Sequence, residues 1–157
     1  MYGLIREENS FGANPGTKDL ARHLYTRIYG GKVVIIANKP SAFLPALRKQ
    51  WLKLMRKVQK ERASTLNAER IFELNEVVVR MQSLQFSTTW PPDGYKLADV
   101  YVATIDELLR WAPEMECQTI YVTCEVRPEH LHIITSWLKN NALVVKCRLT
   151  PLPLSKR

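Results

Sequence analysis

The sequence predicts a single three-layer α/β domain built on a mainly parallel sheet of four or five strands. Short runs rich in β-branched residues alternate with amphipathic helical segments, a pattern typical of βαβ units with helices on both faces of the sheet. The 157 residues suit one domain, since single domains commonly contain about 100 to 200 residues. Apolar residues make up 46% and charged residues 24% of the chain, which is typical of a globular protein.

The first part of the chain predicts a helix followed by a buried strand. The hydroxyl of Thr17 can cap a helix that ends at the glycine pair 30–31. Apolar residues four positions apart mark the buried face of this helix, namely Leu20, Leu24 and Ile28. Residues 32–38 (KVVIIAN) are apolar and rich in β-branched side chains, so they predict a strand that is buried on both faces.

A helical segment of about residues 42–84 is expected after this strand. Pro45 falls near its start, where a missing N–H is tolerated, and residues 63–66 indicate a break before the capping residue Asn67. Apolar stripes mark both halves of the segment: Leu47, Trp51, Leu54, Met55 and Val58 in the first, and Ile71, Leu74, Val78 and Met81 in the second. The segment is either a helical hairpin or one long bent helix.

The second half of the chain alternates strands with helices. Thr104 and Glu107 have the spacing of a capping box, and Pro128 suits the first position of a helix. Apolar runs predict strands at 99–103, 119–126 and 142–149, with a short additional strand at 85–89. One domain, residues 1–157, therefore includes the whole chain and finishes with a short basic tail at 150–157.

Sequence motifs of nucleotide-binding proteins and of hydrolases are absent. The chain has no G-x-G-x-x-G, G-x-x-x-x-G-K-[ST], G-x-S-x-G or H-E-x-x-H. Residues 38–41 (NKPS) stand where a phosphate loop would follow the first strand, but they contain no glycine to let backbone N–H groups approach phosphate. The order of strands and helices resembles that of Rossmann-like domains and of the RecA-like fold without its phosphate loop. We expect no cofactor.

The basic residues are concentrated in one predicted helix. Residues 47–62 carry seven basic side chains against one acidic side chain, a net charge of +6 out of the chain's +8. A merely solvated helix normally mixes both signs, as residues 69–80 do, because like charges at i, i+4 cost helix stability. The candidate nucleic-acid-binding residues are Arg48, Lys49, Lys53, Arg56, Lys57, Lys60 and Arg62.

This basic face has three interpretations. Cations at helical spacing can follow a phosphate backbone and release its counterions. Cationic amphipathic helices also dock on acidic proteins or on membrane surfaces, and a charged face can simply be solvated. We favour binding of DNA or RNA through the backbone, as an accessory subunit of a nucleoprotein complex. Only Gln50 and Gln59 offer amide groups for reading bases, so we expect little sequence specificity.

An enzyme with a site at the strand ends is the competing interpretation. The carboxyl ends of parallel strands form the ligand crevice of open α/β sheets, and four charged residues follow predicted strands, namely Lys39, Asp106, Glu125 and Arg127. Asp106 is explained equally well as a first-turn residue of a helix, and Glu125 with Arg127 as a surface ion pair. We therefore expect a binding protein rather than an enzyme and assign no catalytic residue.

The cysteines and histidines predict no metal site. An odd number of cysteines without C-x2-C spacing argues against a disulfide framework and against zinc, and it fits a reducing, cytoplasmic compartment. His130 and His132 are two positions apart on a predicted helix, so they face different directions. No apolar run reaches the roughly 18 residues of a membrane span, and residues 1–10 lack the apolar core of a secretory signal.

Two further regions are candidates for contact with a protein partner. Residues 105–129 carry six acidic and two basic side chains, a net charge of −4. Residues 90–94 (WPPDG) form a turn that Phe86, Trp90 and Tyr95 flank or begin, and exposed loop aromatics suit protein contacts or base stacking. We prefer the alternative that these aromatics cover the edge of the sheet. Trp51 belongs to an apolar stripe and is expected in the core.

Overall fold

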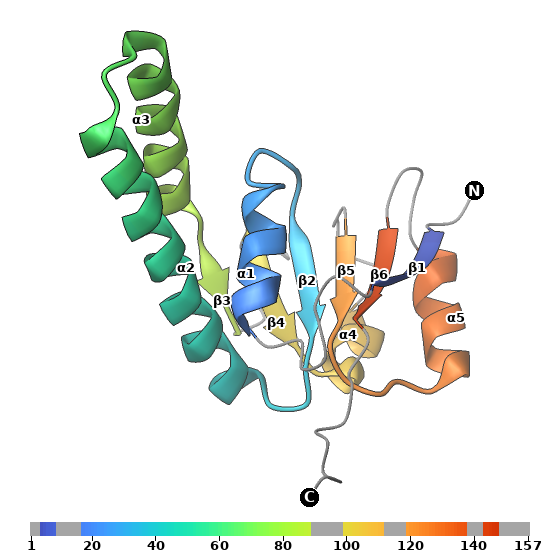
Figure 1. Ribbon diagram of the computed structural model, residues 1–157. Coiled ribbons are helices and arrows are strands. Elements are labelled where there is room, and N and C mark those ends of the chain that lie inside the picture. The colour runs from blue at the N-terminus through green and yellow to red at the C-terminus, as the bar shows by residue number, and fades with distance from the viewer. Residues whose placement is uncertain (1–3, 9–16, 89–98, 112–118, 138–142, 148–157) are drawn as a thin grey trace, which may run out of the picture.

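The computed structural model contains a six-stranded, all-parallel sheet in the order β1-β6-β5-β2-β4-β3 (Figure 1). It describes residues 4–8, 17–88, 99–111, 119–137 and 143–147. The strands are β1 (Leu4–Glu8), β2 (Val33–Ile36), β3 (Phe86–Ser87), β4 (Val100–Ala103), β5 (Thr119–Val122) and β6 (Leu143–Cys147). The helices are α1 (Thr17–Tyr25), α2 (Pro40–Ser64), α3 (Ala68–Ser83), α4 (Ile105–Trp111) and α5 (Pro128–Trp137).

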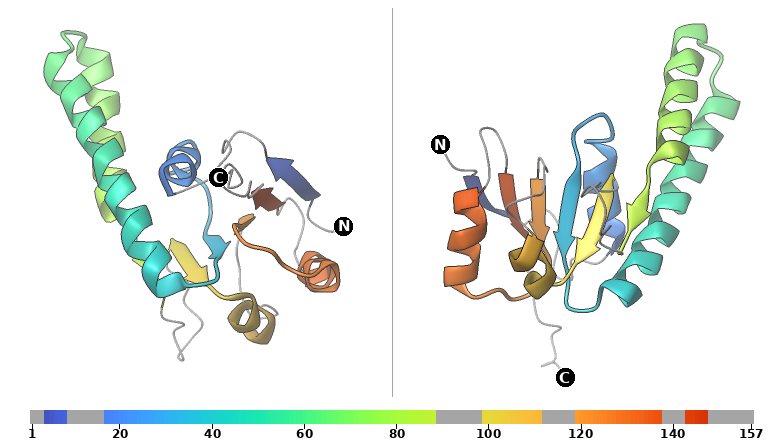
Figure 2. Two further views of the ribbon diagram at one scale, coloured as in Figure 1. Left: turned by 60° about the horizontal axis from the view of Figure 1, so that its bottom comes forward. Right: turned by 180° about the vertical axis from the view of Figure 1, so that it is seen from behind.

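Strand β2 lies inside the sheet and pairs with β4 on one side and β5 on the other. Val33 is in register with Val100 of β4 and Thr119 of β5. From the end of β2 the chain passes to α2, whereas from β4 and β5 it passes to α4 and α5 on the opposite face (Figure 2). The chain therefore changes faces at β2, the position where open α/β sheets usually bind ligands.

Two hydrophobic cores, one on each face of the sheet, establish the three layers. Alternate residues of a strand point to opposite faces, and in β2 Val33 and Ile35 join one core while Val34 and Ile36 join the other. The first core is closed by α1, α2 and α3, and the second by α4 and α5. All four residues of β2, β4 and β5 are buried, as expected for central strands covered on both faces.

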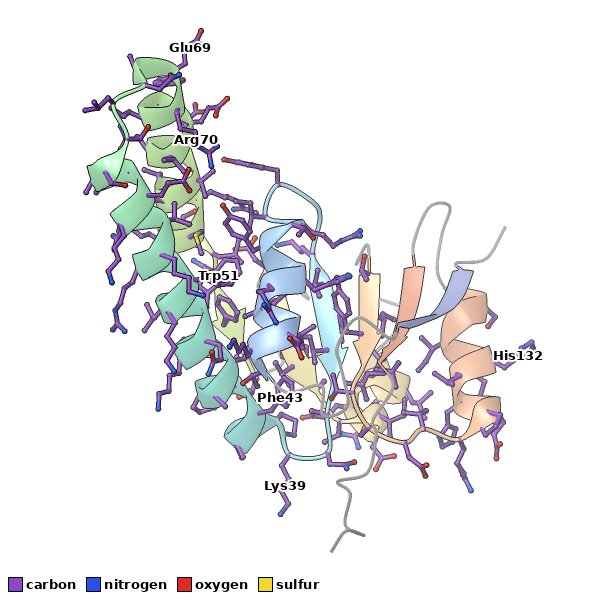
Figure 3. The ribbon with its side chains drawn as sticks, in the orientation of Figure 1. Lys39, Phe43, Trp51, Glu69, Arg70 and His132 are labelled. Carbon is purple, nitrogen blue, oxygen red and sulfur yellow. The ribbon has the colours of Figure 1, made fainter. Side chains whose placement is uncertain are left out.

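The inserted segment is a hairpin of two long helices rather than one bent helix. Asn67 caps α3, because its side-chain oxygen accepts a hydrogen bond from the backbone N–H of Arg70 at 3.0 Å. Trp51 is 2% exposed and donates from Nε1 to the carbonyl of Met81 at 3.1 Å, which fastens α2 to α3 (Figure 3). Trp51 also meets Phe86 of β3 edge to face, with ring centroids 5.8 Å apart, so the hairpin packs on the sheet edge.

The structure confirms the three-layer α/β class, and it differs from the sequence prediction in detail. The sheet has six strands instead of four or five, because residues 4–8, whose polar sequence LIREE gave no apolar signal, pair with β6. Helix α2 begins at Pro40, two residues earlier than expected, so Pro45 lies beyond the first turn. The predicted capping box is present, with Thr104 N–H donating to Glu107 Oε1 at 2.9 Å and Glu107 N–H donating to Thr104 Oγ1 at 3.1 Å.

Candidate nucleic-acid interface

The solvent-facing side of α2 carries most of the basic residues that the sequence singles out. The buried face of the helix is formed by Leu44, Leu47, Trp51, Met55 and Val58. At about 100° per residue, the opposite side is an arc of roughly 100° occupied by five exposed cations, Lys49, Lys53, Arg56, Lys57 and Lys60. We call these five residues the basic face. They extend over eleven residue steps, or about 16 Å of helix.

The basic face has no anionic counterpart among the residues that the structure describes. None of its five side chains makes an ion pair or hydrogen bond within that part of the chain. Arg70 on α3 behaves differently, since it reaches Glu61 Oε2 at 2.9 Å and Glu73 Oε1 at 3.2 Å. The hydrogen bonds from these carboxylates, Glu61 first, raise the pKa of Arg70. Cations that stabilise the hairpin thus have acidic partners, and those of the basic face are left for solvent or for a ligand.

Two of the seven predicted binding residues hold the hairpin together instead. Arg48 donates to the carbonyl of Phe86 at 3.1 Å, and its guanidinium lies 6.0 Å from the centre of the Phe86 ring. Arg62 donates to Asn75 Oδ1 of α3 at 3.0 Å and is only half exposed. Both arginines point away from the centre of the basic face, so their first role is to fasten α2 to β3 and to α3.

A groove between α1 and α2 adds two cations that the sequence analysis did not select. It has a volume of about 290 Å³ and is lined by Lys18 and Arg22 of α1 and by Gln50, Lys53, Leu54 and Lys57 of α2. Arg22 also pairs with Asp19, one turn earlier on α1. The i, i+4 spacing of Lys18 and Arg22 places both on one face of α1, but only the packing of α1 against α2 brings that face to the basic helix.

The four residues proposed for a strand-end crevice lie at the expected edge of the sheet and are all exposed. Lys39 precedes α2, makes no side-chain cap and points away from the body of the protein (Figure 3). Asp106 lies in the first turn of α4. Arg127 approaches Glu129 Oε2 at 3.6 Å and His130 Nε2 at 3.4 Å, rather than Glu125. The enzyme interpretation remains a prediction, and the two grooves described here are lined by other residues.

The described histidines and cysteine have structural surroundings. His23 Nδ1 lies 2.8 Å from the hydroxyl of Tyr121, and the two rings meet edge to face. Cys124 is a free, buried thiol, and burial raises its pKa. His132 points outward from α5 (Figure 3). Within the described ranges, no cluster of three or more His, Cys, Asp or Glu side chains is placed to hold a metal ion. Cys117 lies outside those ranges, as does the Cys147 side chain.

The regions predicted to contact a protein partner are described only in part. Asp106, Glu125 and Glu129 are exposed at the α4 and α5 side of the sheet, whereas Glu114 and Glu116 lie outside the described residues. Phe86 is half-buried at the sheet edge, as we preferred for the aromatic turn, and Trp90 and Tyr95 lie outside the described residues.

A second and larger groove borders α3, and sequence reasoning did not find it. It has a volume of about 740 Å³ and combines apolar with charged walls, formed by Tyr29, Arg70, Glu73, Asn75, Glu76, Val77, Val79, Arg80 and Ser83. Tyr29 and Val79 are 66% and 63% exposed. Its charges have both signs, so it lacks the one-signed field of the basic face.

Comparisons with known proteins give no relative from which a function could be transferred. No protein-family model, curated protein sequence or solved structure matches the chain. No helix in the described part of the chain has the length and apolar character needed to cross a membrane. The functional argument therefore depends on the residues themselves.

Proposed function

We propose that the protein binds nucleic acid through the sugar–phosphate backbone, with the basic face of α2 as the contact surface. The observation that supports this proposal is the arc of five exposed cations that have no anionic partner in the described part of the chain. Each phosphate that a cation neutralises releases condensed counterions, which favours binding. A rigid helix presents these cations at fixed spacing, so little side-chain ordering beyond the lysine stems is needed.

The proposed contact is largely independent of nucleic-acid sequence. Base edges are read by groups that both donate and accept hydrogen bonds, such as Asn and Gln. The basic face contains only Lys and Arg, and the nearby Gln50 and Gln59 are half-buried at its borders. The protein is thus suited to an accessory role in a nucleoprotein complex, where another component supplies sequence recognition or catalysis.

The experiment is a fluorescence-anisotropy titration with labelled single- and double-stranded DNA and RNA at several salt concentrations. Five phosphate contacts predict a log–log salt slope of about −3 or steeper. The fourfold variant Lys49→Glu/Lys53→Glu/Lys57→Glu/Lys60→Glu should abolish binding. Absence of binding by the wild-type protein at low salt would exclude this function.

An interaction module is the second candidate, because the same unpaired cations would also suit an acidic protein surface. The fourfold variant would abolish that contact as well, so the two candidates are separated by the wild-type titration. Binding to all four labelled nucleic acids with a steep salt slope supports the first candidate. Failure to bind any of them, combined with capture of a defined acidic polypeptide such as poly-glutamate, supports the second.

A further inference from the structure

The groove between α1 and α2 has cations on both of its walls. Lys18 and Arg22 project from α1, and Lys53 and Lys57 project from α2. Each pair is spaced i, i+4, so its members lie about 6 Å apart along the helix axis. Only Asp19, which pairs with Arg22, provides a carboxylate next to these four cations in the described part of the chain.

The groove walls match the chemistry of a phosphodiester backbone. Four cations provide the positive field, the amide of Gln50 provides a hydrogen-bond donor, and Leu54 provides an apolar surface for a sugar. The volume of about 290 Å³ is at the lower end of the range for small-molecule sites, roughly 300–1,000 Å³. The space therefore suits a short piece of one strand and excludes a base pair.

We propose that this groove holds backbone phosphates of a single nucleic-acid strand, so that Lys18 and Arg22 of α1 belong to the binding surface together with α2. The inference rests on the proposed function and extends it, because it identifies the path of the strand. Lys53 and Lys57 are shared by the groove and by the basic face. The strand lies between α1 and α2 at these two lysines and continues over Lys49, Arg56 and Lys60.

Electrostatic repulsion within the groove supports an anionic occupant. Lys18 with Arg22 and Lys53 with Lys57 are like-charged i, i+4 pairs, and such pairs destabilise helices by a few tenths of a kcal/mol each. Packing α1 against α2 brings the two pairs together at one groove. A phosphate between the walls is attracted by all four cations and offsets this repulsion.

The test compares the double variant Lys18→Ala/Arg22→Ala with the control Lys39→Ala/Arg110→Ala in the anisotropy titration. Both variants remove two exposed cations from the full chain, and the control positions lie at the strand ends and on α4. For the groove variant we expect binding at least about fivefold weaker and a salt slope shallower by about 2, since each lost phosphate contact removes about 0.9 from the slope. The control should leave both quantities unchanged.

Two further variants separate the groove from the basic face and from folding. The exchange Lys18→Arg/Arg22→Lys keeps both charges and should retain wild-type binding, with circular dichroism confirming the fold of each variant. The groove assignment is overturned if Lys18→Ala/Arg22→Ala binds like the wild type while Lys49→Ala/Lys60→Ala binds more weakly, and the proposed function then survives. If the wild type itself binds nothing, both proposals fail.

Discussion

Reversing the charge of Lys53 should weaken nucleic-acid binding and at the same time stabilise the folded protein. Lys53 is exposed at the centre of the basic face, with Lys49 one turn before it and Lys57 one turn after it. In Lys53→Glu, two repulsive i, i+4 contacts are replaced by two attractive ones. The helix propensities of Lys and Glu are nearly equal, and the exposed position leaves the core unchanged.

The size of the stabilisation follows from the pairs involved. Each like-charge pair costs roughly 0.2–0.5 kcal/mol, and each opposite-charge pair contributes a similar amount. Two pairs that each change sign give about 1 kcal/mol at low salt, and the cations of α1 across the groove act in the same direction. For a chain of this length, this raises the melting temperature by about 2–4 °C. The gain should shrink at high salt, because exposed charges are screened.

The assay pairs thermal unfolding, followed by circular dichroism, with the anisotropy titration. Lys53→Glu should melt higher and bind more weakly, with a salt slope shallower by about 1. Arg110→Glu is the matched control, because Arg110 is exposed on α4 and follows Asp106 by four residues. That control makes the same change in net charge, should lose a few tenths of a kcal/mol and should bind normally. Wild-type affinity in Lys53→Glu would refute the assignment of the basic face.

Three further predictions concern the capping box, the core tyrosine and the groove. Thr104→Ala removes the acceptor for Glu107 N–H and should lower the free energy of unfolding by about 1 kcal/mol, measured by urea denaturation. Burial, together with the charge of Glu107, raises the pKa of Tyr101; the resulting stabilisation is complete below the unfolded pKa of about 10 and is lost as pH rises toward the folded pKa, so Tyr101→Phe should show a smaller loss of stability between pH 9 and pH 11. Asp19→Asn releases Arg22 from its ion pair and should tighten nucleic-acid binding at low salt by up to about fivefold, the limit set by the strength of an exposed pair; unchanged affinity would argue against Arg22 as a phosphate ligand.

The sequence predicts the central architecture because local and global signals agree there. Strands β2, β4 and β5 are short apolar runs buried on both faces, and the caps at Asn67 and Thr104 lie where side-chain chemistry places them. Strand β1 has no such signal. Its sequence LIREE mixes charge with apolar residues, and it becomes a strand only through its pairing with β6. Edge strands of this kind depend on a partner that is far away in sequence.

The binding surface is predictable only where it lies on one helix. The charge of α2 follows from composition, and helical spacing shows that five cations share a face. The contributions of Lys18 and Arg22 depend on the packing of α1 against α2, which helical periodicity does not encode. Conversely, the sequence could not separate Arg48 and Arg62 from the other cations, because their partners, Phe86 and Asn75, lie on β3 and α3.

That separation assigns stability and binding to different cations of the same helix. Arg48→Ala loses a hydrogen bond and a contact with the Phe86 ring, so it should cost about 1 kcal/mol of stability and change affinity little. Lys49 and Lys60 contact no described carboxylate or ring, so Lys49→Ala/Lys60→Ala should leave stability nearly constant and make the salt slope shallower by about 2. Urea denaturation and anisotropy on the same samples measure both quantities. If Arg48→Ala weakened binding as much as the lysine variant at equal folded fraction, the basic face would have to include the β3 side of α2, and the division between fastening and binding cations would be wrong.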